Sequence, residues 1–267
     1  MYNTERPGWL SKTVTALTFL FLLLPLVVII LCSFSPSQIL QFPPKSFSLK
    51  WYRNIFTSSA KFMTGLVYSL EIGIIATAVD IVIGVLGCLA VSRYSFKGRQ
   101  ALVTFMTSPL YVPSITFAFV LLNIFSQIRG SSAAVEILLG HIVIILPYII
   151  RNTLAIMSGF DWNLEDASES LGANPLYTFL HITFPIIKPG VTAGALLAFL
   201  YSFDEAVVAR LLHGITFNTL PVIIMNYMTF DFDPTIAAIS SILIVASLIL
   251  MIIMEKVVGL DVFLKTN

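Results

Sequence analysis

Charged residues are scarce in this chain, and that shortage is its first informative property. Only 11% of its 267 residues are Asp, Glu, Lys or Arg, whereas soluble domains carry about 25%. The formal net charge of +1 gives no basis for binding nucleic acid. Hydrophobic residues make up 57% of the chain, and its mean hydropathy is +0.93. We therefore expect an integral membrane protein.

The residue types that build catalytic and metal sites are also few. Cys32 and Cys88 lie near the ends of the first two apolar runs, where opposite crossing directions would keep their thiols apart. His141, His181 and His213 are widely separated and have no partners at the spacing of metal ligands. The phosphate-binding pattern G-x-x-x-x-G-K-[ST] is missing. We therefore expect no enzyme activity, no metal site and no cofactor in this chain.

What the chain has instead is a series of apolar runs, several of them long enough to cross a bilayer. A spanning helix needs about 20 mostly apolar residues. Six runs meet this length, at residues 10–34, 62–91, 101–125, 133–157, 189–212 and 236–258. They predict an all-α membrane protein with six transmembrane helices in one domain, residues 1–267. The first run is too long for the core of a signal peptide, so we expect it in the mature protein.

The positions of the basic residues indicate the orientation of these spans. Placing both termini in the cytoplasm puts most of the 15 Lys and Arg residues inside, as the positive-inside rule requires. The short loop from Arg93 to Arg99 is the densest basic site and weighs most. With this orientation the long connection 158–188 is cytoplasmic.

That connection contains a polar stretch that predicts a short helix. Asn163 followed by Asp166 has the spacing of a capping box, and Gly172 is placed to end the helix. One face would carry small and apolar residues, namely Leu164, Ala167, Ser168 and Leu171. The segment therefore predicts an amphipathic helix that docks to a partner outside the bilayer.

Four carboxylates fall inside the expected spans: Glu71, Asp80, Asp204 and Glu205. A charge near the bilayer centre costs about 3 kcal/mol, so such residues usually face a cavity or a partner. Glu71 and Asp80 are nine positions apart, which is half a turn out of phase on a helix. They cannot both face one narrow pathway. Asp80 shares a face with two glycines and is expected to be a packing residue, so Glu71 is the better pathway candidate.

Arg210 lies near the outer end of the fifth run, six positions after Asp204 and too far for direct pairing along one helix. A salt bridge between Glu71 and Arg210 is one interpretation. In the other, the acidic groups bind a cationic solute, and Arg210 would add recognition of a carboxylate. The predicted pathway residues are Glu71, Tyr201, Phe203, Asp204, Glu205 and Arg210.

The cytoplasmic segment resembles the EAA loop of bacterial ABC importer permeases. That loop has Glu-Ala-Ala, three residues, a glycine, nine residues, and Ile-x-Leu-Pro. This chain has Asp166-Ala167-Ser168, Gly172 and Ile182-Thr183-Phe184-Pro185 at the same spacing. The resemblance implies a cytoplasmic coupling loop, residues 158–188, that binds an ATPase through Glu165, Asp166, Ala167, Ser168, Glu169, Gly172, Ile182 and Pro185.

Further segments are similar to the spermidine/putrescine-type branch of that family, including Phe42-Pro43-Pro44-Lys45, Leu49-Lys50-Trp51-Tyr52 and Ser202-Phe203-Asp204-Glu205. The branch implies import of a polyamine or another amine-bearing solute. The charges at Glu71, Asp80 and Arg210 are not typical of a plain polyamine permease. A zwitterionic amino acid, an opine or an aminophosphonate-like solute therefore stays open.

The resemblance also implies the fold of a type I ABC importer permease and an assembly of several chains. A second permease subunit, homologous or identical, would complete the pathway in the bacterial cytoplasmic (inner) membrane. Two cytoplasmic ATPase subunits would bind ATP and Mg, and an extracytoplasmic binding protein would deliver the solute. Two rival hypotheses are an ion-driven secondary transporter that uses Glu71 and Asp80, and a membrane anchor that transports nothing.

Overall fold

A computed structural model describes residues 8–57, 60–128, 130–212, 214, 217–230 and 233–258. All regular secondary structure in these ranges is helical, which confirms the expected all-α class. The chain divides into two compact units, one from residues 1–63 and 226–251 and the other from 64–225 and 252–267. The expected single permease domain stays a prediction.

The first unit is held together by the short helix α2. Its helices are α1 (Trp9–Ser33), α2 (Lys50–Thr57) and most of α12 (Thr235–Val258). The Tyr52 hydroxyl lies 2.6 Å from both the Ser33 and the Ser241 hydroxyls, and Asn54 donates a hydrogen bond to Thr235 at 2.9 Å. Polar side chains of α2 therefore link α1 to α12, two helices at opposite ends of the sequence.

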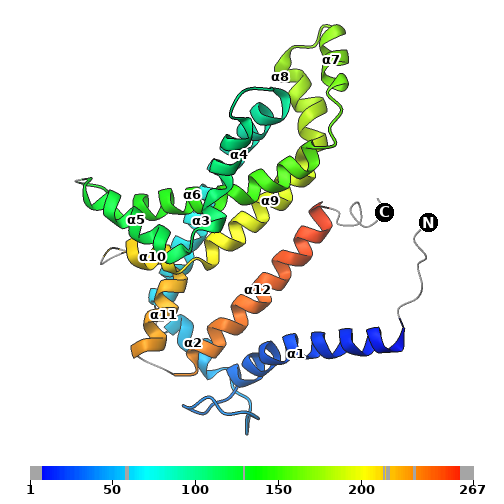
Figure 1. Cartoon of the computed structure of the whole chain (residues 1–267). Coiled ribbons are helices and arrows are strands. Elements are labelled where there is room, and N and C mark those ends of the chain that lie inside the picture. The colour runs from blue at the N-terminus through cyan, green and yellow to red at the C-terminus, as the bar shows by residue number, and fades with distance from the viewer. Residues whose placement is uncertain are drawn as a thin grey trace. The chain divides into compact units, whose positions relative to one another are not determined.

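The second unit contains the remaining helices, among them the predicted docking segment. They are most of α3 (Ala60–Arg93), α4 (Arg99–Thr107), η1 (Ser108–Tyr111), α5 (Ser114–Ser126), α6 (Ala133–Met157), α7 (Asn163–Ser170), α8 (Pro175–Thr178), the π-turn η2 (Phe179–Thr183), α9 (Phe184–Asp204), α10 (Val207–Leu212) and most of α11 (Leu220–Phe230). Within this unit, α7 and α8 lie beyond one end of the α6–α9 pair (Figure 1). The loop between the two long helices thus projects from the spans that it connects.

The core of the second unit is the close contact between α6 and α9. Every fourth residue of α9 on this side is small and buried, in the order Gly190, Gly194, Ala198 and Ser202. A Cβ atom added at Gly190 would lie 2.7 Å from the backbone oxygen of Asn152, and one at Gly194 would lie 2.7 Å from the Cα of Ile149. Because small residues let two backbones approach, this stripe sets the distance between the helices.

Four described helices are long and apolar enough to cross a membrane: α1, α3, α6 and the continuous helix from Pro175 to Asp204. The third expected span, residues 101–125, is not straight. It is broken into Arg99–Tyr111 and Ser114–Ser126, which meet at 105°. Val112 is extended (φ −93°, ψ 126°) because it precedes Pro113, which disfavours helical backbone in the residue before it. The bend makes this segment either one broken span or a re-entrant loop.

The fifth expected span, residues 189–212, also differs from the structure. The helix already begins at Pro175 and ends at Asp204, and Glu205 is extended (φ −70°, ψ 109°). The Glu205 carboxylate accepts hydrogen bonds from the amides of Val207 and Val208, at 2.8 and 3.0 Å. It thereby caps the separate helix α10. The helix α11 forms where a loop was expected. The bounds of α12 agree with those of the sixth expected span. The count of six spans stays a prediction.

The α6–α9 contact leads to a stability prediction. Replacing Gly194 by Ala should destabilise the protein by about 1–3 kcal/mol, because the added methyl group meets backbone atoms that cannot turn away. The matched control is Gly159→Ala, where the nearest atom to an added Cβ is 4.0 Å away. Thermal unfolding of the purified protein in detergent measures both variants. Equal Tm values for the two variants would contradict this account of the packing.

Candidate functional site

The helix α7 begins and ends through local backbone chemistry. The expected N-cap at Asn163 is wrong, because Asn163 is already the first helical residue and Trp162 is the cap. Asp161 instead accepts hydrogen bonds from the backbone and side-chain nitrogens of Asn163, at 3.1 and 2.8 Å. The expected end is confirmed. Gly172 has φ +89°, a left-handed conformation that stops the helix at little cost for glycine.

The two faces of α7 differ from the simple amphipathic pattern. Its buried residues are Glu165 and Ser168. The apolar residues Leu164 and Leu171 are exposed, and 90% of the Leu171 surface is free. Asp166 is exposed as well. The helix thus directs one charged side chain into its own chain and presents apolar and acidic groups outward.

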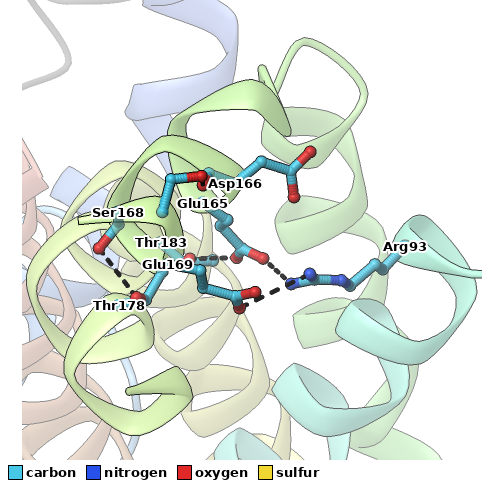
Figure 2. A network of polar contacts seen from close by, with 8 residues as sticks. Arg93, Glu165, Asp166, Ser168, Glu169, Thr178 and Thr183 are labelled. Carbon is cyan, nitrogen blue, oxygen red and sulfur yellow. Dashed lines mark hydrogen bonds and ion pairs between the residues drawn. The ribbon is translucent and has the colours of Figure 1, made fainter. Parts of the chain in front are cut away.

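Glu165 joins three separate elements. Arg93, the last residue of α3, donates to its Oε2 atom, and Thr183 of η2 donates to its Oε1 atom. These two residues approach the carboxylate from opposite sides (Figure 2). Glu165 is only 4% exposed, so its charge needs these partners to offset the loss of water. Among the predicted coupling residues, Glu165 is therefore turned toward its own chain.

Two further contacts fix this region. The Ser168 and Thr178 hydroxyls lie 2.9 Å apart and join α7 to α8. The Arg93 guanidinium lies 5.8 Å from the centre of the Trp162 ring, a distance suited to a cation–π contact. Glu169 lies 3.8 Å from Arg93 and forms a second, looser ion pair. The sequence placed Arg93 in a basic loop but gave no sign of its contact with α7, 72 positions away.

The second half of the predicted coupling motif forms the entry to α9. Ile182 is half-buried and Pro185 is exposed. Proline cannot donate a hydrogen bond to the carbonyl four residues earlier, here His181. The π-turn Phe179–Thr183 ends two residues before Pro185, and it places the Thr183 hydroxyl against Glu165.

Three of the predicted pathway residues, Tyr201, Asp204 and Glu205, lie around a cavity of about 370 Å³ at the end of α9. It is lined by Tyr148, Leu197, Leu200, Tyr201, Asp204 and Glu205. The rings of Tyr148 and Tyr201 have centres 5.2 Å apart, and the Tyr201 hydroxyl lies 3.3 Å from the hydroxyl of Ser114 on α5. Asp204 is exposed. Sequence reasoning missed Tyr148 and Ser114, because nothing in the apolar runs of α5 and α6 marks them.

The other predicted pathway residues do not line this cavity. Glu71 is exposed on α3, whereas Asp80 on the same helix is fully buried. The expectation that they face different ways is therefore confirmed. Phe203 is half-buried, with its ring 6.0 Å from that of Phe199. Arg210 is half-buried on α10, and its pairing with Glu71 stays an interpretation.

His141 and both cysteines are buried within the chain, whereas His181 is exposed. His141 is buried, with Nδ1 2.7 Å from the Ser202 hydroxyl. Cys32 and Cys88 are buried free thiols, while His213 lies outside the described residues. Across the part of the chain that the structure describes, no three His, Cys, Asp or Glu side chains are grouped to hold a metal ion.

Several known proteins are similar to this chain over most of its length. The permease PotC of the Haemophilus influenzae spermidine/putrescine transport system is 28% identical, over 90% of this chain and 92% of the relative. The putrescine permease PotI of Escherichia coli K12 is 26% identical, over 85% and 83%. A putative 2-aminoethylphosphonate permease, PhnV of Salmonella typhimurium, is 27% identical over 91% of each chain.

Two solved structures share the fold. One is a bacterial ABC transporter that imports alginate, with a TM-score of 0.68 over 94% of this chain and 95% of that chain, at 14% identity. The other is an amino acid ABC transporter, with a TM-score of 0.56 over 79% and 96%, also at 14% identity. A family model matches residues 80–258. The chain is a multi-pass membrane protein that belongs to the family of binding-protein-dependent transport system inner membrane components, the permeases of ABC importers.

Proposed function

We propose that this permease imports a polyamine or another amine-bearing solute, with energy supplied by separate ATPase subunits. The observation that carries the solute class is the similarity to spermidine/putrescine and putrescine permeases over 85–90% of the chain. The observation that supports coupling is the exposure of Leu164 and Leu171 at the two ends of α7, a helix that glycine terminates. An exposed apolar surface of this kind is typical of a protein–protein contact.

Besides the solute and the membrane lipid, the transporter would contain four further protein chains beyond this one. A homologous or identical permease completes the pathway, and each of two cytoplasmic ATPases receives one coupling helix while binding ATP and Mg. A receptor on the outer side delivers the solute. Both termini of this chain lie in the cytoplasm. ATP shifts the population between inward-open and outward-open states because it binds one of them more tightly. The nucleotide pocket and the magnesium site belong to the ATPases.

The docking surface of α7 would be formed by its outward residues. Asp166, Ala167 and Leu171 are exposed and free to contact an ATPase groove. Glu165 and Ser168 hold the helix in place from the other side, through Arg93 and Thr178. Gly172, Ile182 and Pro185 shape the loop that carries it. Docking and positioning are thus divided between the two faces of one helix.

The turn at Gly172 gives a test of coupling. Gly172→Val should leave membrane insertion intact but reduce solute-stimulated ATP hydrolysis at least about 10-fold, because a β-branched residue is strained at positive φ by about 1–3 kcal/mol. An added Cβ meets no atom within 4 Å there, so only the backbone conformation is tested. Gly172→Asn is the matched control, since Asn tolerates left-handed backbone. Normal stimulation in Gly172→Val, measured in proteoliposomes, would argue against the docking role.

The orientation of the coupling loop can be tested by labelling. A cysteine placed at Leu171, which is 90% exposed, should react with an impermeant maleimide in inside-out vesicles and not in intact cells. The native thiols Cys32 and Cys88 are buried and should add little background. Labelling of Leu171→Cys from the outside of intact cells would overturn the cytoplasmic placement and the coupling role with it.

The solute is proposed to pass the cavity at the end of α9. Two tyrosine rings attract an ammonium group through their faces, and the exposed Asp204 supplies the opposite charge. The full proposed pathway set remains Glu71, Tyr201, Phe203, Asp204, Glu205 and Arg210. Glu205 is the least suited to a test, because its carboxylate also caps α10.

Asp204 gives the clearest test of solute binding. Asp204→Asn should weaken putrescine uptake about 10-fold, equivalent to about 1.4 kcal/mol, while assembly with the ATPases is unchanged. Tyr148→Phe is the comparison variant, because it keeps the ring face and should retain most uptake. Glu71→Gln tests whether the path continues along α3. Normal uptake in both Asp204→Asn and Glu71→Gln would assign these carboxylates to structure alone.

A solute with both an amine and an acidic group is the second candidate. The 27% identical relative named for 2-aminoethylphosphonate supports it, and the half-buried Arg210 would suit the anionic end. Competition of putrescine uptake by 2-aminoethylphosphonate distinguishes the two candidates. Strong competition that is lost in Arg210→Gln would favour the zwitterionic solute.

A further inference from the structure

We propose that Arg93 is a positioning residue that makes α3 move together with the coupling helix α7. The chain itself connects α7 only to α6 before it and to α9 after it. The contact of Arg93 with Glu165 adds α3 as a third element. The inference rests on the proposed function, since it assumes that an ATPase moves α7.

Arg93 is suited to this role by its place and its contacts. It is the last residue of α3, and its guanidinium reaches Trp162 just before α7 as well as Glu165 and Glu169 within it. Figure 2 shows the side chain extending from α3 toward both carboxylates. A single side chain thus contacts the start of α7 and its middle, which restricts both the position and the tilt of the helix.

The two ion pairs of Arg93, with Glu165 and with Glu169, differ in how far the carboxylate is buried. The Glu165 side chain is 5% exposed and both of its oxygens are occupied, Oε2 by Arg93 and Oε1 by Thr183. The Glu169 side chain is 40% exposed and lies 3.8 Å from Arg93. Exposed pairs contribute little, whereas a buried charge that loses its partner is strongly unfavourable. The Arg93–Glu165 contact therefore resists separation when α7 is displaced.

The helix α3 can carry a displacement to the candidate solute cavity. From Arg93 back to Gly73 is twenty residues, or about 30 Å along a rigid helix. A Cβ added at Gly73 would lie 3.0 Å from the Phe199 ring and 3.8 Å from the Ser202 hydroxyl on α9. Ser202 precedes Asp204 by two residues. Contacts at Gly73 are apolar or weakly polar and permit sliding, so the directional contact at Arg93 determines how α3 follows α7.

A distance measurement tests the joint movement directly in the assembled transporter. Spin labels on Leu86→Cys in α3 and on Leu171→Cys at the C-terminal end of α7, both exposed positions, should keep their separation when ATP and vanadate are added. In Arg93→Gln the separation should change on the same addition. A changed separation in the chain with native Arg93 overturns the proposal, and this measurement needs no variant of the ion pair to accumulate.

Measurements of ATP hydrolysis and putrescine uptake test whether the Arg93 contact matters for transport. Per assembled complex, Arg93→Gln should retain ATPase binding and basal ATP hydrolysis, while stimulated hydrolysis and uptake of radiolabelled putrescine fall about 10-fold. Exchanging the charges in Arg93→Glu with Glu165→Arg should restore part of the uptake that each single change removes. Arg99→Gln is the matched control, an exposed arginine in the same loop with no ion pair seen in the described part of the chain.

The outcomes separate this proposal from the proposed function. If Arg93→Gln reduces only the amount of protein, and uptake per complex stays normal, then Arg93 contributes to stability alone. That result overturns the positioning role. Failure of the native chain to copurify with an ATPase overturns the proposed function instead. Loss of uptake together with loss of ATPase binding in Arg93→Gln also contradicts the proposal, because the outward face of α7 should remain intact.

Discussion

A buried carboxylate holds the helix α7 against its own chain. Glu165 is almost fully buried, and its two carboxylate oxygens accept hydrogen bonds from Arg93 and Thr183. A charge in that position is tolerable only when its partners are in place, so the end of α3, the helix α7 and the entry to α9 must come together. The loop between α6 and α9 is thereby held in one arrangement.

Hydrogen bonding of polar groups also explains how the chain leaves the helix α9. Within a membrane, backbone amides and carbonyls need partners from the chain itself. Glu205 supplies them to the amides of Val207 and Val208, which lets the chain leave one helix and start another beside the cavity. Pro113 acts differently: it forces Val112 out of the helix and turns the chain by 105°. Both breaks lie on elements that contribute residues near Tyr201.

The sequence predicted those features that depend on local chemistry. Long apolar runs predicted the helices, and Gly172 predicted the end of α7 because left-handed backbone favours glycine. The break at Pro113 was missed because the hydropathy of the run outweighed its prolines. Arg93 with Glu165, and Tyr148 with Tyr201, were missed for another reason: these pairs are 72 and 53 positions apart and come together only when helices pack. Spacing along one helix carries no information about such pairs.

These two unpredicted pairs lie at opposite ends of α9. The Arg93–Glu165 contact lies at the loop between α6 and α9, whereas the tyrosine pair lies at the far end of α9, next to Asp204. Between them, α9 packs on α6 through a stripe of small residues, where an extra methyl group would meet backbone atoms. Such a contact resists compression, and the 2.7 Å hydrogen bond between His141 Nδ1 and the Ser202 hydroxyl adds a directional link between the same two helices. In the proposed mechanism, the ion pair receives a pull on the loop, and the α6–α9 pair transmits it as one packed unit to the end of α9 that lines the cavity.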